Sequence, residues 1–417
     1  MPVNKKSKIN NLITWLHLWL GLVSGIVVVI VSITGCLFVF QQEISDWVRH
    51  DAYYVTPPAG HAVVLPVSEL KKSAQKALGA DKPVQYITAY NDPDRAWEFM
   101  SYKPGNPKAL TYSGSIDYYQ SVFVNPYTGA VTGKVDYTHD FFVIVKAIHW
   151  SLYLSNQYGQ PIVGWGTLIF VLILITGFIM WIPKRWTKAE KNKAFKVKWT
   201  AKFKRLNYDL HNILGFYTLI VALILAFTGM MYAFQWFNKA VYATATLSAS
   251  APVYPDFSSG PGAVADNIVP LDKAYMAGRV RFPQAARYLL IMPATDKAAI
   301  NFVAYPKAGV YYASDAAYYD QYSGKFLGES LCKNENNGQK LLDMKYDIHV
   351  GSIAGLPGKI IAFLVSLVCA SLPVTGFIIW WGRKKKKGKK KAGKANPKLQ
   401  AERIPAPKKL VALVDVE

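Results

Sequence analysis

Two apolar stretches of this sequence each begin with a histidine and end with the dipeptide Thr-Gly. They are TWLHLWLGLVSGIVVVIVSITG, which carries His17, and NYDLHNILGFYTLIVALILAFTG, which carries His211. Two further apolar stretches follow His149 and His349 and contain the same dipeptide. A run of about 20 apolar residues is long enough to cross a bilayer as a helix. The sequence therefore predicts an integral membrane protein with four transmembrane helices, near residues 12–40, 161–182, 210–237 and 357–381.

Positive charge is concentrated in the short segments of the chain. The formal net charge of +22 comes largely from the N-terminus, from the tail that opens with RKKKKGKKK at Arg383, and from residues 183–207, which have ten Lys/Arg and one Glu. The connections 41–140 and 238–345 are nearly balanced in charge. Short basic flanks stay in the cytoplasm, so both termini and the middle linker are predicted inside and the two long connections outside. We expect the tail to meet the anionic leaflet of the bilayer and no nucleic acid.

The two outer connections have mixed patterns of secondary structure. Residues 65–80 have helical periodicity, whereas PVQYITAYN and RAWEFMSY alternate as strands do. The second connection has similar strand patterns in RYLLIMPA and INFVAYP. Three cysteines with no C-x-x-C-H motif give neither a disulfide framework nor covalent haem attachment. Each connection is therefore predicted to form an α+β domain.

The order of these features is the same in the two halves of the chain. His17 and His211 are 194 residues apart, and His149 and His349 are 200 apart. The turns NPYTGAVTG and DQYSGKFLG, which begin at Asn125 and Asp320, repeat at a similar interval. Each half crosses the membrane twice, so both halves point the same way. This predicts a parallel repeat with a pseudo-two-fold axis along the membrane normal.

That axis brings the histidines together in pairs. His17 and His211 begin outward-running helices and share the inner side, whereas His149 and His349 precede inward-running helices and share the outer side. Two facing imidazoles suit the two axial positions of a haem iron. The sequence therefore predicts two haem b groups, each with two histidine ligands. Hydrated histidines at the lipid head groups and a site for another transition metal are the alternatives, but the scarcity of Cys, Asp and Glu beside the pairs favours haem over zinc.

The Thr-Gly dipeptides lie at the depths of these pairs. From His17 to Thr34 an α-helix rises about 26 Å, so each dipeptide falls level with a histidine pair at the other end of the bundle. We interpret the glycines as clearance for porphyrin faces or edges, with ordinary helix packing as the alternative. The predicted haem-iron ligands are His17, His211, His149 and His349, and the other predicted cofactor-binding residues are Thr34, Gly35, Thr176, Gly177, Thr228, Gly229, Thr375 and Gly376.

Other polar residues near these motifs have less certain roles. Asp209 and Asp347 each precede a histidine by two residues and either cap a helix or support the ligands from a second shell. His50, His61 and His139 have no partner in the repeat and are assigned to the surface, with the role of His139 left open. No residue is predicted to act as a catalytic acid or base.

The chain resembles the PepSY-associated transmembrane family of bacterial inner membranes. The motifs are LHLWLGLVSG, IHWSLYL, DLHNILGFY and IHVGSIAGLPGK, one around each histidine, and the match covers nearly all of residues 10–383. The resemblance implies four helices that carry PepSY-like periplasmic domains. One branch of the family is similar to dihaem ferric-siderophore reductases, which implies electron transfer from a cytoplasmic or membrane donor to a ferric chelate. A haem-free protein that binds or regulates periplasmic proteins or peptidases is the alternative, as is a cytochrome that serves another periplasmic oxidoreductase.

The expected architecture is thus a four-helix transmembrane bundle with an internal two-fold repeat and two α+β domains. Its segments are the N-terminus and first helix, 1–40; the first outer domain, 41–140; the outer histidine segment and second helix, 141–183; the basic linker, 184–207; the third helix, 208–237; the second outer domain, 238–345; the fourth helix, 346–382; and a disordered basic tail, 383–417.

Overall fold

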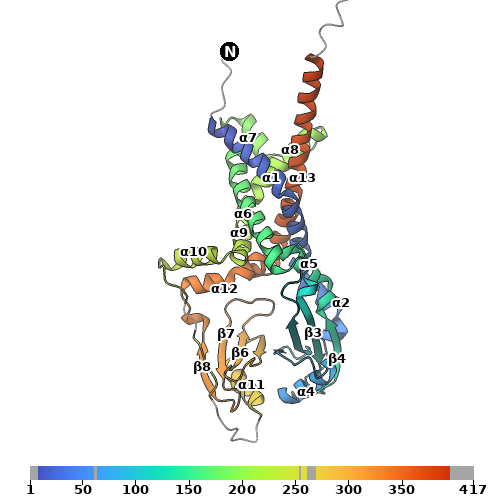
Figure 1. Cartoon of the computed structure of the whole chain (residues 1–417), viewed down its shortest axis with the longest axis vertical. Helices are drawn as coiled ribbons and strands as arrows, with labels where there is room; N and C mark the ends of the chain where they lie inside the picture. The colour runs from blue at the N-terminus through green and yellow to red at the C-terminus, as the bar shows by residue number, and fades with distance from the viewer. Residues whose placement is uncertain (1–7, 61–62, 253–254, 261–268, 395–417) are drawn as a thin grey trace, which may run out of the picture.

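The computed structural model describes residues 8–60, 63–252, 255–260 and 269–394. The chain forms a bundle of long helices that stands on a domain built around a β-sheet (Figure 1). The start of the first helix and the end of the last helix both lie at the far end of the bundle from the sheet. We call that end the terminal side and the other end the sheet side.

Four helical segments are long and apolar enough to cross a membrane. Apolar side chains on the outside of these helices are exposed: Val23 is 71% exposed, Ile26 71% and Ile220 72%. Apolar surface of this extent is unfavourable in water and natural in lipid, so this is a helical membrane protein. The four segments are α1 (Lys8–Val39), α6 (Asn156–Trp181), the continuous run of α8 (Phe203–Asp209), η3 (Leu210–Leu214) and α9 (Gly215–Ala233), and α13 (Gly355–Lys394).

Two helix boundaries differ from the sequence prediction. Pro161 is expected in the first turn of its helix, but α6 begins at Asn156 and holds this proline in its second turn. The tail is expected to be disordered from residue 383, but α13 continues to Lys394. Lysine is a good helix former, and the next proline is Pro397, so no proline interrupts the helix between residues 383 and 394.

The two outer domains expected for 41–140 and 238–345 are in fact the halves of one antiparallel sheet. Its eight strands lie in the order β4-β3-β2-β1-β5-β6-β7-β8. At the centre β1 pairs with β5, with Thr88 opposite Leu289, and this pairing leaves neither strand as an open edge. The strands are β1 (Tyr86–Tyr90), β2 (Trp97–Pro104), β3 (Ile116–Val124), β4 (Val131–Asp136), β5 (Arg287–Ile291), β6 (Ile300–Tyr305), β7 (Asp315–Tyr319) and β8 (Phe326–Ser330).

One hydrophobic core joins the two halves of the sheet. The helices α4 (Val67–Leu78) and α11 (Pro270–Arg281) contribute to it together with one face of the strands. Ile87, Phe99 and Phe302 in this core have no exposed surface. The backbone N–H of Ser68 donates to Asp272 Oδ1 at 2.8 Å and so ties α4 to α11. The sheet domain is therefore a single folded unit.

Shorter helices connect the bundle to the sheet. Among them α10 and α12 lie side by side across the sheet-side end of the bundle (Figure 1), where Asn336 Nδ2 donates to Tyr242 Oη at 2.9 Å. Two of the connecting helices, α5 and α12, end near His149 and at His349. The connecting elements are α2 (Gln41–Val48), α3 (His50–Tyr53), η1 (Ser113–Ser115), η2 (Tyr137–His139), α5 (Phe141–Ser151), α7 (Lys188–Phe195), α10 (Gln235–Thr246), η4 (Cys332–Asn334), α12 (Asn337–His349) and η5 (Ser352–Ala354).

Glu335, which precedes α12, interacts with Asp343 in the middle of that helix, and this carboxyl pair predicts a pH-dependent stability. Burial and the neighbouring Asp343 raise the pKa of Glu335 from 4.5 to about 7. A raised pKa in the folded state means that the protonated form is the stabilising one. This stability is present below pH 4.5 and is lost as the pH rises through about 7. We expect the Tm of the detergent-solubilised protein to fall over this range.

The variant Glu335→Gln tests this assignment because it removes the titrating group. Its Tm is expected to vary less with pH than that of the wild type. Glu69→Gln, which changes an exposed carboxylate on α4, serves as the control and is expected to keep the wild-type profile. Equal pH profiles for Glu335→Gln and wild type would exclude this carboxyl pair as the cause.

Candidate functional site: two histidine pairs

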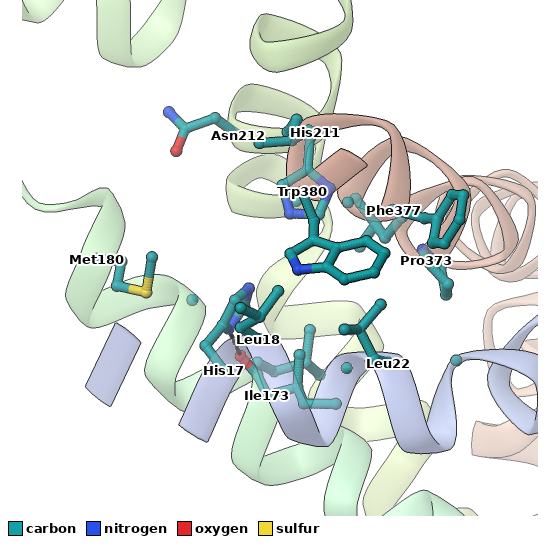
Figure 2. A pocket seen from close by; sticks show the side chains of 18 of the residues that line it. His17, Leu18, Leu22, Ile173, Met180, His211, Asn212, Pro373, Phe377 and Trp380 are labelled. Carbon is teal, nitrogen blue, oxygen red and sulfur yellow. Dashed lines mark hydrogen bonds between the residues drawn. The ribbon is translucent and has the colours of Figure 1, made fainter. Parts of the chain in front are cut away.

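The first histidine pair lies on the terminal side of the bundle. His17 comes from α1 and His211 from η3, and their ring centroids are 6.4 Å apart with an interplanar angle of 83°. Figure 2 shows the two imidazoles entering the same space from different helices. The element η3 is a π-helical turn, a form that often marks functional positions within α-helices.

The second pair lies at the sheet side. His149 comes from the last turn of α5 and His349 is the last residue of α12. Their ring centroids are 5.9 Å apart, with an interplanar angle of 65°. Both pairs thus join the first half of the chain to the second half, as the repeat predicts.

Every one of these imidazoles meets the threonine of a Thr-Gly dipeptide through its Nδ1 atom. The Nδ1–Oγ1 distances are 3.1 Å for His17 and Thr176, 3.3 Å for His149 and Thr34, 2.9 Å for His211 and Thr375, and 2.8 Å for His349 and Thr228. Each of the four Thr-Gly dipeptides therefore makes the same Nδ1–Oγ1 contact with one histidine, at the depth that the helical rise predicts.

These contacts fix which ring nitrogen carries the proton. Each threonine hydroxyl donates its hydrogen to a backbone carbonyl one turn earlier in its own helix, as Thr228 does to Ile224 at 2.8 Å. Its oxygen is then left to accept from the imidazole. Backbone carbonyls, which can only accept, also contact Nδ1: Val31 at 2.9 Å from His149 and Ile173 at 3.2 Å from His17. Nδ1 is therefore the protonated nitrogen, and Nε2 keeps the lone pair that binds a metal.

The glycine of each dipeptide leaves room for the imidazole ring. The sequence interpretation assigns this clearance to porphyrin, but the nearest side-chain atoms in the structure belong to the histidines. An added Cβ would meet the Cε1 atoms at 3.2 Å for Gly35 and His149, 3.1 Å for Gly177 and His17, 3.5 Å for Gly229 and His349, and 3.2 Å for Gly376 and His211. A side chain at Gly35, Gly177 or Gly376 would shift the imidazole by a few tenths of an ångström, whereas the distance at Gly229 is an ordinary van der Waals contact.

The separation of the rings suits two imidazoles on one metal ion. A bond between a metal and an imidazole nitrogen is about 2 Å long, and that nitrogen lies about 1 Å from its ring centre. Two imidazoles on opposite sides of one ion therefore have ring centres about 6 Å apart. The observed separations are 6.4 and 5.9 Å. Nε2 makes no hydrogen bond in any of the four rings within the part of the chain that the structure describes.

The terminal-side pair opens onto a cavity of about 690 Å³ between the helices. Sites for cofactor-sized molecules occupy roughly 300–1,000 Å³. Apolar and aromatic side chains dominate its lining, as Figure 2 shows, among them Leu22, Ile173, Phe377 and Trp380. The basic residues Arg383 and Lys384 line it as well. The size and lining of the cavity suit a largely apolar molecule that carries some negative charge.

A comparison with protein families identifies the chain. The sequence model of the PepSY-associated TM region matches residues 14–383. This chain belongs to the PepSY-associated TM region family. No curated protein gives a match.

In this family member the other polar candidates do not touch the histidines. Asp209 accepts from Arg205 Nε at 2.7 Å and Asp347 accepts from the backbone N–H of Tyr311 at 3.0 Å. The hydrogen-bond partners of the imidazoles are therefore the threonines and backbone carbonyls, which carry no charge. Sequence reasoning reached these threonines through the repeat but did not assign them a contact with Nδ1.

The remaining histidines lie outside the pairs. His50 is on the surface, where it stacks on Tyr54 at 4.6 Å, and His61 lies outside the described residues. His139 lines a polar pocket of about 340 Å³ on the sheet domain. Among the described residues no group of three or more His, Cys, Asp or Glu is placed to bind a metal ion, and each pair would offer a metal two imidazoles.

Replacing one threonine of the family member tests the hydrogen bond that orients its histidine. Thr228→Val keeps the shape of the side chain and leaves Nδ1 of His349 without its hydroxyl acceptor. Nδ1 keeps the backbone carbonyl of Leu225 as an acceptor, and the loss of one hydrogen bond costs about 0.5–1.5 kcal/mol, so we expect a lower free energy of unfolding and a lower Tm. Thr244→Val, at an exposed threonine on α10 that bonds only within its helix at 2.7 Å, is the control. Equal losses in both variants would show that the Thr228 contact is not specific.

Proposed function

We propose that this protein is a dihaem b-type cytochrome that carries electrons across the bacterial inner membrane and reduces a ferric chelate in the periplasm. The observation that carries the proposal is the recurrence of one arrangement at four histidines. Each has Nδ1 bonded to a threonine, Nε2 available for a metal, and a partner imidazole about 6 Å away. A ferric siderophore is the chelate that the family resemblance favours.

The donor set of the site fits haem. A porphyrin provides four nitrogens around its iron and leaves the two axial positions to the protein. Each pair supplies two neutral imidazoles, and His17 with His211 adds an apolar cavity with two basic residues at its rim. A bound haem would supply one-electron chemistry, because its iron alternates between Fe(III) and Fe(II). His17 and His211 would hold one such group, and His149 and His349 the other.

The protein's own residues set the conditions for this chemistry. The four threonines hold the imidazoles in one tautomer and one orientation, so that little rearrangement is needed when an electron arrives. A neutral hydroxyl partner makes the imidazole a weaker donor than a carboxylate partner would. Burial among apolar side chains also disfavours extra positive charge on the iron. Both effects favour the reduced state and a potential above that of a solvent-exposed, carboxylate-supported site.

Transfer to a ferric chelate needs no acid or base. One electron converts Fe(III) to Fe(II), which hard oxygen ligands bind less tightly, and the iron is released. The sheet-side pair is the one nearer to the sheet domain, so we assign the acceptor to that side and an unidentified cytoplasmic or membrane donor to the terminal side.

The proposed orientation places the sheet domain in the periplasm, and the three cysteines allow a direct test. Cys332 lies beside the sheet and is half-buried, whereas Cys36 and Cys369 are buried in the bundle. We expect a membrane-impermeant maleimide to label intact spheroplasts at Cys332. Burial raises the pKa of this thiol, so labelling is expected to be faster at alkaline pH. Cys332→Ser is the control, and labelling only after lysis would reverse the orientation.

Haem content per chain tests the cofactor assignment. Purified wild-type protein is expected to carry two haems per chain with the spectrum of six-coordinate haem b. His349→Ala is expected to retain one haem, held by the terminal-side pair, and His17→Ala one haem held by the sheet-side pair. The measurements are the pyridine haemochrome assay and the visible spectrum of each variant.

His139→Ala is the matched control for these variants, because His139 lies outside both pairs and is expected to be dispensable for haem. Wild-type protein without a Soret band would end the proposal and favour a haem-free membrane protein that binds periplasmic proteins. Dithionite-reduced protein that carries haem but is not reoxidised by ferric chelates would favour a cytochrome that serves another periplasmic oxidoreductase.

A further inference from the structure

One arginine of the sheet domain lies at the seam between the two halves of the sheet. Arg287 is the first residue of β5 and is paired with Tyr90 of β1 on one side and with Tyr305 of β6 on the other. Its guanidinium lies 4.2 Å from the ring centroid of Tyr305 and 4.5 Å from that of Tyr311. The two aromatic rings hold the cation in place without supplying a hydrogen-bond acceptor.

The guanidinium of Arg287 has donors without acceptors. Its Nε and Nη2 atoms are buried and make no hydrogen bond within the described part of the chain. Other arginines of this domain are paired, such as Arg95 with Asp46 at 3.0 Å and Arg281 with Glu329. Buried donors without partners are unfavourable and rare in native proteins. A ligand with anionic oxygens would satisfy them.

The carboxylates closest to this arginine are committed elsewhere. Glu98 accepts from Ser121 Oγ at 2.7 Å and from Tyr137 Oη at 3.2 Å, and burial raises its pKa while the nearby charge of Arg287 lowers it. Asp347 accepts from the backbone N–H groups of Tyr311 at 3.0 Å and of Tyr312 at 2.9 Å. The positive charge of Arg287 is therefore not neutralised by an ion pair with either residue.

A short series of contacts joins this arginine to the sheet-side histidine pair. Tyr311, which contacts the guanidinium, lies 5.0 Å from the ring of Tyr346 on α12. Tyr346 precedes His349 by three residues, a spacing that puts both side chains on one face of the helix. A ligand at Arg287 would thus lie within a few side chains of His349.

We propose that Arg287, held between Tyr305 and Tyr311, binds a carboxylate or other anionic oxygen of the ferric chelate. This inference rests on the proposed function and names the substrate site for it: an anionic chelate with hard oxygen ligands, placed next to the sheet-side pair. The forked guanidinium matches two oxygens of one anionic group. The chelated Fe(III) gains one electron at this place and leaves as Fe(II).

The pseudo-two-fold axis predicts a single site of this kind in each chain. The symmetric pairing of β1 with β5 sets Tyr86 opposite Ile291 and Tyr90 opposite Arg287. Tyr86 therefore occupies the position equivalent to Arg287 in the first half. A tyrosine there provides no cation, so one chelate per chain is the expected stoichiometry.

Binding of a chelate that cannot be reduced tests the site separately from electron transfer. Gallium(III) citrate has the charge and shape of the ferric complex and accepts no electron under these conditions. We expect calorimetric titration of the detergent-solubilised full-length protein to give one site per chain. In Arg287→Ala the affinity is expected to fall by at least about tenfold, because two charge-assisted hydrogen bonds are lost.

Two control variants make the titration decisive. Arg281→Ala removes an arginine that is also stacked on an aromatic ring, at 4.4 Å from the centroid of Phe326, but is already paired with Glu329, and is expected to bind gallium citrate as the wild type does. Arg287→Lys keeps the positive charge but lacks the two parallel donors of the guanidinium, so we expect an intermediate affinity. This variant tests the site even if Arg287→Ala does not fold. Because Arg287→Ala also loses the contacts with Tyr305 and Tyr311, its Tm is measured to verify that the variant is folded.

The outcomes separate this inference from the proposed function. Equal affinities for gallium citrate in Arg287→Ala and wild type, with haem present in both, would overturn the site and leave the cytochrome in place. Equal affinity of the wild type for gallium citrate and for metal-free citrate would overturn the assignment to a chelate. Protein without haem would end the proposed function, and the titration would still decide whether Arg287 binds the anion.

Discussion

The hydrogen bond between a histidine Nδ1 and a threonine hydroxyl is the interaction on which the rest of this structure depends. A polar side chain at membrane depth has no water to bond with, so its partners must come from the protein. The threonines meet this requirement because each hydroxyl donates to its own helix and keeps an oxygen for the imidazole. The adjacent glycine lets the ring approach. One dipeptide thus solves both the polar and the steric problem of placing an imidazole inside a bundle.

The contact between a histidine and a Thr-Gly dipeptide occurs four times in the two-fold repeat. The two halves of the chain meet at three levels. The histidine pairs connect the halves near each end of the bundle, and β1 with β5 connects them in the sheet. Departures from symmetry are local. His211 lies on a π-helical turn, whereas His17 lies within the uninterrupted α1. Arg287 takes the place of Tyr86 at the seam. The symmetric parts build the scaffold, and the asymmetric residues are positions where the two halves can differ in role.

Local patterns in the sequence predict much of this fold. Apolar runs give four membrane-spanning helices, and the positions of His17, His149, His211 and His349 in the repeat give their pairing, because helix length converts directly into depth. The fusion of two predicted domains into one sheet could not be read in this way. It depends on the pairing of the edges of β1 and β5, which are about 200 residues apart in the sequence. The residue pattern of neither strand indicates which other strand it pairs with. The contact of each threonine with Nδ1 depends likewise on side-chain direction across helices.

The position of the sheet-side pair at helix ends has a mechanical consequence. His149 lies in the last turn of α5, and Asp140 caps the first turn of that helix. Asp140 also forms an ion pair with Arg49, in the segment that leads into the sheet. His349 follows from α12, where Asp347 holds the backbone of Tyr311 in the loop after β6. Both imidazoles are therefore attached to the sheet domain as firmly as to the bundle. The terminal-side pair, in contrast, is set by membrane helices alone. A change in the sheet domain, such as a ligand at the seam, can thus alter the geometry of the sheet-side pair and leave the terminal-side pair unchanged.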